Sequence, residues 1–259
     1  MQIATWNVNS IRVRIEHVKN WLTLYPVDVL CLQETKVVDG DFPTAPLEEL
    51  GYHVYFAGQK SYNGVALVSR FPLEDVQVGF APVVGDDLLD EQKRVISGCL
   101  NGVRIINLYV PNGQSLDSPK YDYKMEWLKL LEQYLQKLLP GELCVCGDFN
   151  IAPEDRDIYN PKGKDKYVMA TPAEREALIK ILDLGLKDAF RKFTPETGHY
   201  SWWDYRHGGF ANNRGWRIDH IYLTSGLLQQ ATSCIIDVEP RKQEQPSDHA
   251  PVILQLSLC

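Results

Sequence analysis

The chain has 259 residues, of which 44% are apolar and 24% are charged, a composition typical of a globular protein with a large core. No run of 18 apolar residues occurs, which excludes a membrane-spanning helix. The formal net charge of −7 does not favour a nucleic-acid partner, although basic residues cluster over 156–166 and 206–217.

The six cysteines include no CxxC pair: Cys31, Cys99, Cys144, Cys146, Cys234 and Cys259. Most of them lie in apolar, strand-like runs, which is typical of reduced, buried thiols and argues against disulfides or a zinc site. The N-terminus lacks the basic segment and apolar stretch of a signal peptide. We therefore expect a cytoplasmic protein without a membrane partner.

The predicted elements begin with a buried strand over 2–8 and a helix that Ser10 caps and Pro26 ends. A second strand is predicted over 28–33. Four short β-type runs follow, separated by Gly, Pro and Asn, over 52–56, 64–69, 94–100 and 103–110.

The second half of the chain contains two predicted helices. An amphipathic helix fits 119–139, and a capping box at Thr171–Glu174 opens the other helix. The strands of this half are predicted over 143–147, 218–223, 232–238 and 251–257. Because crossovers and hairpin-like neighbours both occur, we predict an α/β fold with two mixed sheets packed face to face and helices outside. No linker divides the chain, so residues 1–259 are expected to form one domain.

Polar side chains recur where the predicted strands end or begin: Asn7, Glu34, Tyr109, Asn112, Asp148, Asn150, Asp219, Asp248 and His249. Strand ends from different parts of a chain can meet on one rim of a sheet sandwich. We therefore expect these side chains to share one site.

Such a set suits phosphodiester hydrolysis. Mg²⁺ takes oxygen ligands and commonly binds only one or two carboxylates besides water and phosphate. Glu34 is the natural primary ligand, because no other acid lies close to the rim formed by the first strands. The metal polarises a phosphoryl oxygen, and the Asp248-His249 pair supplies an oriented imidazole for phosphate or water.

Each feature alone has an ordinary structural explanation. Gly-Asp-Phe-Asn at 147–150 is more often a turn with local hydrogen bonds. Asp219 lies in an apolar strand, where it can be a satisfied buried carboxylate, and His249 before a strand can face solvent. Only their occurrence together, in order, favours catalysis.

Six successive motifs resemble the endonuclease/exonuclease/phosphatase superfamily: WNVNS (6–10), LQETK (32–36), NLYVPNG (107–113), GDFN (147–150), GWRID (215–219) and SDHAPV (247–252). The segment SWWDYR…NNRGWRIDH (201–220) is similar, more narrowly, to exonuclease III and related abasic-site endonucleases. The resemblance covers the chain from Met1 to about residue 256. It implies a four-layered, DNase I-like sandwich and a DNA-repair nuclease that uses Mg²⁺, with Mn²⁺ able to replace it.

The implied activity is cleavage of the DNA backbone 5′ to abasic sites, accompanied by 3′→5′ exonuclease and 3′-phosphatase action in base excision repair. The resemblance implies that Asp148, assisted by Asn150, orients or deprotonates the attacking water. It leaves the identity of the general base and the number of metal ions open. The residues implied to lie at the metal are Asn7, Glu34, Asp148, Asn150, Asp248 and His249.

The resemblance assigns the phosphate contacts to three positions. His249, held by Asp219, would contact the scissile phosphate, and Tyr109 and Asn112 would hydrogen-bond the phosphate or the leaving oxygen. The catalytic set would thus combine an acid, an imidazole and neutral donors.

Substrate recognition is expected in the aromatic and basic segment. Trp202 and Trp216 match positions that wall the pocket for a flipped, base-free sugar in this family, since a missing base lowers the cost of extrusion. Arg206 and Phe210 are expected to enter the duplex or grip phosphates. Trp203 is expected in the core instead. The implied partner is double-stranded DNA with abasic sites or blocked 3′ ends, bound by a monomer.

Two departures from the family pattern affect the details. Asn9 stands where some relatives have Asp, so a second metal-binding carboxylate is missing there. Lys164 and Tyr167 replace asparagines of the animal enzymes, which leaves the DNA contacts of that loop open. The chain resembles the compact bacterial form, which implies work at the nucleoid of a bacterial cytoplasm.

Two other functions fit part of the pattern. A phosphatase or phospholipase of the same superfamily would use Glu34, Asp148 and His249 in the same way, because fold does not fix the substrate. A DNA-binding protein that has lost catalysis would lack one of these three residues. The NNRGWRIDH segment favours the nuclease over both alternatives.

Overall fold

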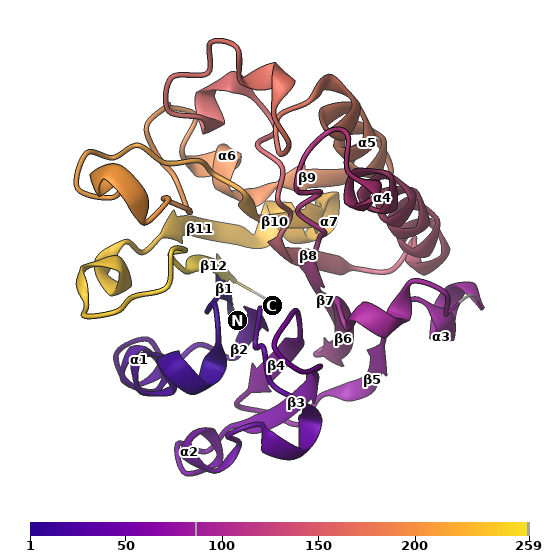
Figure 1. The fold of residues 1–259 in the computed structure, drawn as a ribbon. Helices are drawn as coiled ribbons and strands as arrows, with labels where there is room; N and C mark the ends of the chain where they lie inside the picture. The colour runs from indigo at the N-terminus through magenta and orange to yellow at the C-terminus, as the bar shows by residue number, and fades with distance from the viewer. Residues whose placement is uncertain (86, 258–259) are drawn as a thin grey trace.

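The computed structural model describes residues 1–85 and 87–257 and contains two six-stranded sheets that pack face to face (Figure 1). Helices cover the outer face of each sheet, so that the chain forms four layers. The predicted α/β sandwich with two mixed sheets is confirmed.

The first sheet has the strand order β11-β12-β1-β2-β4-β3. Its centre is β1 (Gln2–Asn7), which pairs parallel with β2 (Val29–Gln33) and antiparallel with β12 (Val252–Leu256). The remaining strands are β3 (His53–Ala57), β4 (Val65–Ser69) and β11 (Ala231–Ile236).

The second sheet has the order β5-β6-β7-β8-β10-β9. In its centre β7 (Val103–Tyr109) runs parallel to β8 (Leu143–Asp148), which is antiparallel to β10 (Asp219–Thr224). The outer strands are β5 (Glu74–Val78), β6 (Val95–Leu100) and β9 (Leu186–Asp188). The sequence patterns did not predict β5 or β9, because the first is half exposed and the second has only three residues.

Seven α-helices lie in the described part of the chain. They are α1 (Ile11–Leu24), α2 (Ala45–Glu48), α3 (Ala81–Val84), α4 (Pro119–Leu138), α5 (Pro172–Asp183), α6 (Ala189–Phe193) and α7 (Ser225–Gln230). The long helices follow the predicted ranges, and Thr171 and Glu174 form the expected capping box of α5. Ser10 occupies the predicted N-cap position of α1, but its φ is 90° and its side chain makes no capping hydrogen bond.

Three apolar clusters hold these layers together. One lies between the two sheets and includes Ile3, Ile105 and Ile221. A second packs α4 and α5 against the second sheet, and a third packs α1 and α2 against the first sheet. Burial on both faces explains why the central strands are continuous apolar runs.

The cysteines lie mainly in the core. The five cysteines within the described residues are free thiols, and four of them are buried, whereas Cys259 lies outside the described residues. None of the helices described has the length and apolar character needed to cross a membrane.

The sheet arrangement brings several functional strand ends to one rim. The parallel strands β1 and β2 end at Asn7 and Gln33, and the parallel strands β7 and β8 end at Tyr109 and Asp148. Gly147 lets β8 approach β7, because a Cβ at this position would lie 1.9 Å from the carbonyl oxygen of Leu108.

Candidate active site

A cleft of about 270 Å³ opens on this rim, and most of the predicted site residues line it. Register places three of the predicted residues side by side, because Tyr109 pairs with Asp148 and Asp148 with Asp219 across neighbouring strands. The lining residues are Glu34, Tyr109, Asn112, Asp148, Asn150, Met169, Trp202, Ile218, Asp248 and His249.

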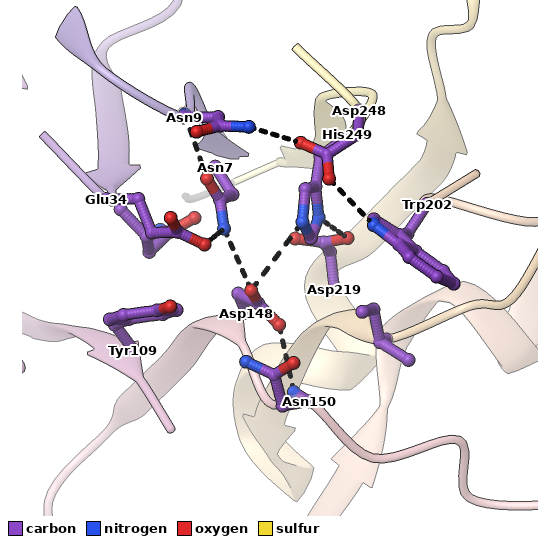
Figure 2. Close-up of polar contacts among 12 residues, drawn as sticks. Asn7, Asn9, Glu34, Tyr109, Asp148, Asn150, Trp202, Asp219, Asp248 and His249 are labelled. Atoms are coloured by element: carbon purple, nitrogen blue, oxygen red, sulfur yellow. Dashed lines mark hydrogen bonds and ion pairs between the residues drawn. The ribbon is translucent and has the colours of Figure 1, made fainter. Parts of the chain in front are cut away.

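Two carboxylates face each other across the amide of Asn7 (Figure 2). Asn7 Nδ2 donates to Glu34 Oε1 at 2.8 Å and to Asp148 Oδ2 at 2.9 Å. Burial, opposed by the charge of His249, raises the pKa of Asp148 above its usual value, and the charges of Asp219 and Glu34 add to the rise. The surroundings therefore stabilise the charged form of Asp148 less well than water does.

Lys36 balances part of this charge. Its Nζ lies 2.7 Å from Glu34 Oε2 and donates to Asn9 Oδ1 at 2.6 Å. Burial alone would raise the pKa of Glu34, but the ammonium group of Lys36 and the amide of Asn7 lower it. Glu34 is thus held as a carboxylate at the edge of the cleft.

His249 stands between two aspartates. Its Nδ1 lies 2.8 Å from Asp219 Oδ2, and its Nε2 lies 3.8 Å from Asp148 Oδ2. Ser201 Oγ also donates to Asp219 Oδ2, at 2.6 Å. Burial would lower the pKa of His249, but the charges of Asp219 and Asp148 outweigh burial and raise it. The imidazole is therefore held in the protonated form, with Nε2 directed toward the cleft.

Neutral side chains complete this wall of the cleft. Asn150 N donates to Asp148 Oδ1 at 2.9 Å, and Asn112 Nδ2 donates to Asn150 Oδ1 at 3.0 Å. Burial and the neighbouring Glu34 raise the pKa of Tyr109 well above its usual value. The phenol remains a hydrogen-bond donor at neutral pH.

Asp248 is hydrogen-bonded to Trp202 on the opposite wall of the cleft. Its Oδ1 accepts from Asn9 Nδ2 at 3.0 Å and its Oδ2 accepts from Trp202 Nε1 at 2.9 Å (Figure 2). Burial would raise the pKa of Asp248, but the charge of His249 and these two hydrogen bonds lower it. The structure thus uses this carboxylate to orient Trp202.

The backbone is strained at several of these positions. Glu34, Asn150 and Met169 have φ values of 50°, 47° and 73°, and Asn9 and Lys36 are also left-handed. Non-glycine residues adopt this region at a cost and gather where surrounding structure holds them for function. These left-handed residues border the cleft, although such residues also occur elsewhere in the chain.

The carboxylates of the site fit a hard divalent cation. Oxygens of Glu34 and Asp148 lie within 4.8 Å of each other and of a ring nitrogen of His249, which is protonated and is therefore not a metal ligand in this state. The carboxylates of Glu34 and Asp148 lie on either side of Asn7, and the charge of His249 does not overcome the effect of burial on Asp148. A bound cation would relieve the repulsion between the two carboxylates and would take the oxygen ligands that Mg²⁺ prefers.

The predicted substrate residues fall into two groups. Trp202 lines the cleft, and Trp216 pairs with it in an antiparallel bridge and packs in the same apolar cluster. Phe210 instead packs edge-on against Trp203, with ring centroids 5.1 Å apart, and lines a different cavity. Arg206 is 80% exposed and paired with Asp204. Trp203 is buried, as expected.

Several residues of the site were missed by sequence reasoning. Lys36 lies two residues after Glu34 in the LQETK motif, which was a usable signal. Ser201 begins the aromatic segment, but nothing in the sequence shows that it holds Asp219. Met169 and Ile218 line the cleft from a loop and a strand end, and the sequence analysis did not single them out.

Comparison with known proteins agrees with this geometry. Residues 4–249 match the model of the endonuclease/exonuclease/phosphatase family. The chain is 36% identical to exodeoxyribonuclease III of Haemophilus influenzae, over 97% of this chain and 98% of the relative.

Two solved structures share the fold over their whole length. An AP endonuclease from Archaeoglobus fulgidus superposes with a TM-score of 0.95 at 41% identity, and a 3′-5′ exonuclease from Neisseria meningitidis with 0.95 at 43%, each covering 100% of both chains. The chain therefore belongs to the endonuclease/exonuclease/phosphatase family and is, within it, a DNA-repair nuclease of the exodeoxyribonuclease III type.

Proposed function

We propose that this protein hydrolyses the DNA backbone 5′ to abasic sites in a reaction that depends on Mg²⁺, for which Mn²⁺ can substitute. The same site is proposed to remove 3′-phosphates and terminal nucleotides. The observation that carries the proposal is the convergence of Glu34, Asp148 and the Asp219–His249 pair in one cleft with an aromatic wall.

Asp148 is proposed to receive the proton of the attacking water. It is buried, its pKa is raised, and Asn7 and Asn150 fix both of its oxygens. A base whose pKa lies near the working pH combines a deprotonated form with the ability to accept a proton. The new bond joins the water oxygen to phosphorus.

The scissile phosphate is proposed to lie against His249 Nε2. Because Asp219 holds the imidazole protonated, Nε2 donates a charged hydrogen bond to a phosphate oxygen, which strengthens as charge develops. Tyr109 and Asn112 donate from the other side. The bond from phosphorus to O3′ breaks, and the leaving oxygen takes a proton from solvent water, which gives a 3′-hydroxyl and a 5′-phosphate.

Glu34 is proposed to be the main metal ligand, with Asp148 and the oxygen of a reoriented Asn7 amide beside it. When bound, Mg²⁺ would polarise a phosphoryl oxygen and offset the negative charge that develops there. Lys36 would then share Glu34 with the cation.

The lesion is proposed to enter between Trp202, Ile218 and Met169. The cleft of about 270 Å³ is lined on this side by apolar side chains, which suit a sugar that lacks its base. Extrusion costs least where the base is already missing. Trp216 backs this wall and keeps Trp202 in place.

The proposed partner is therefore double-stranded DNA with abasic sites or blocked 3′ ends, at the nucleoid of a bacterial cell. One domain of residues 1–259, acting as a monomer, is proposed to carry the whole site.

Three duplexes test the substrate assignment: one with a tetrahydrofuran abasic analogue, one undamaged, and one with a 3′-phosphate at a nick. We expect the highest kcat/KM for cleavage just 5′ to the analogue. Removal of the 3′-phosphate with no attack on the analogue would refute the lesion pocket. Inactivity toward all three, with release of phosphate from a small phosphomonoester, would favour a phosphatase.

A further inference from the structure

A buried ammonium group lies directly behind the catalytic cleft. Lys124, on α4, is completely inaccessible to solvent, as is its partner Glu174 on α5. Lys124 Nζ donates to Glu174 Oε1 at 2.5 Å, to the carbonyl oxygen of Asn150 at 2.8 Å and to that of Asn112 at 3.2 Å. A lysine ammonium has three protons, so each finds one acceptor.

Glu174 extends the contact to a third segment. Its Oε1 also accepts from Met169 N at 2.9 Å, and its Oε2 accepts from Thr171 N and Thr171 Oγ1. Met169 lines the cleft with a left-handed backbone. The ion pair therefore joins three chain segments that reach the cleft: the turn after β7, the turn after β8 and the loop before α5.

The backbone contacts control the catalytic side chains. Asn112 and Asn150 hold each other through the 3.0 Å hydrogen bond between their amides, and Asn150 N fixes Asp148 Oδ1. With both carbonyl oxygens bound to one ammonium group, the two turns cannot shift independently. Small displacements of catalytic groups cost large factors in rate, because reacting atoms must be aligned.

We propose that Lys124 and Glu174 are positioning residues, which set the spacing of Asn112, Asn150 and Asp148 for catalysis without touching the substrate. An apolar pair would fill the same space and pack the helices equally well. It would leave the carbonyl oxygens of Asn112 and Asn150 without donors. The need to bind the carbonyl oxygens of these two turns thus explains why the buried pair is charged rather than apolar.

Lys124→Met tests the proposal, because methionine keeps most of the stem and removes all three donors. Leu131→Ala is the matched control: Leu131 is fully buried in the core on the same helix and does not line the cleft. Both variants should lower the melting temperature. At a temperature where both are folded, Lys124→Met should lower kcat for abasic-site incision at least tenfold and change KM less than threefold. Leu131→Ala should keep kcat within twofold of wild type.

Glu174→Gln provides a second test if Lys124→Met does not fold. Glutamine preserves volume and is accepted in capping boxes, so α5 should begin as before, while the ammonium loses its charged partner. We expect kcat to fall severalfold with little change in KM. A kcat equal to that of wild type in Glu174→Gln, or equal losses in Lys124→Met and Leu131→Ala, would overturn the proposal.

The inference rests on the proposed nuclease function, but one readout separates the two. The side-chain amide signals of Asn112 and Asn150 in an NMR spectrum report their mutual hydrogen bond without any turnover. They should shift in Lys124→Met and stay in place in Leu131→Ala. Unchanged signals would refute the positioning role even with an active enzyme, whereas shifted signals in an enzyme inactive on DNA would refute only the proposed function.

Discussion

Replacing Asp219 by asparagine removes one charge from the centre of the site and preserves its shape. Asp219 is buried, and its Oδ2 accepts from His249 Nδ1 at 2.8 Å and from Ser201 Oγ at 2.6 Å. Its charge is the main factor that overcomes burial and raises the pKa of His249. The substitution therefore separates the charge of the partner from its position.

The magnitude follows from the charged hydrogen bond. Such a bond contributes about 1.5–3 kcal/mol, and one pKa unit corresponds to about 1.4 kcal/mol. The pKa of His249 should fall by about one to two units, and the cleavage rate by about 10- to 150-fold. The active imidazolium exists below the raised pKa and is lost as pH rises through it. The alkaline limb of the pH–rate profile should thus move to lower pH.

Single-turnover incision measured from neutral to alkaline pH in saturating Mg²⁺ gives both the loss in cleavage rate and the shift in the pKa of His249. Ser201→Ala is the matched control, because it removes the other donor to Asp219 Oδ2 and leaves the charge in place. Its alkaline limb should remain close to that of wild type. An alkaline limb in Asp219→Asn that coincides with wild type would refute the role given to the protonated imidazole.

Three further changes test other parts of the account. Glu34→Gln should raise the Mg²⁺ concentration for half-maximal activity at least about tenfold, a loss of about 1.4 kcal/mol of binding; an unchanged metal titration would exclude Glu34 as the main ligand. Trp216→Ala removes a partly buried ring and should raise the free-energy barrier for abasic-site incision by about 1.5 kcal/mol, the lower end of the range for burying a large apolar side chain, and the barrier for 3′-phosphate removal by less; equal losses would count against the lesion wall. His220 is fully buried, and burial and the charge of Arg217 lower its pKa to about 4. The neutral imidazole therefore makes its full contribution to the free energy of unfolding above the ordinary histidine pKa of about 6.5. This contribution is lost as the pH falls toward 4. In denaturant unfolding, acidification should therefore lower the free energy of unfolding of His220→Gln by about 3 kcal/mol less than that of wild type. Parallel plots of the free energy of unfolding against pH would contradict this.

The central strands and long helices were predictable because each has a clear signal in its own stretch of sequence. Apolar runs mark β1, β2, β7 and β8, and the Thr171–Glu174 capping box marks the start of α5. Polar residues interrupt these runs at the strand ends. Each has an ordinary structural explanation alone, but none of these explains why they occur together, and their joint occurrence therefore indicated a functional site.

The rest depends on contacts between distant residues. Lys124 lies on an amphipathic helix, where a lysine is expected on the exposed face, and only Glu174, 50 residues later, makes its burial tolerable. Phe210 belongs to an irregular loop, so its packing on Trp203 rather than in the cleft is set by tertiary structure. Ser201 acts through Asp219, a partner that neither sequence periodicity nor spacing identifies.

The central claim is that Asp148 in this cleft drives metal-dependent hydrolysis beside an abasic site. The most direct measurement compares wild type with Asp148→Asn on a duplex that carries one tetrahydrofuran residue, in Mg²⁺ and in EDTA, with binding measured in parallel. We predict that wild type cuts 5′ to the lesion in Mg²⁺ only, leaving a 3′-hydroxyl, and that Asp148→Asn binds equally well but cuts at least about 1,000-fold slower, about 4 kcal/mol. Cleavage in EDTA, or a near-normal rate in Asp148→Asn, would contradict the account.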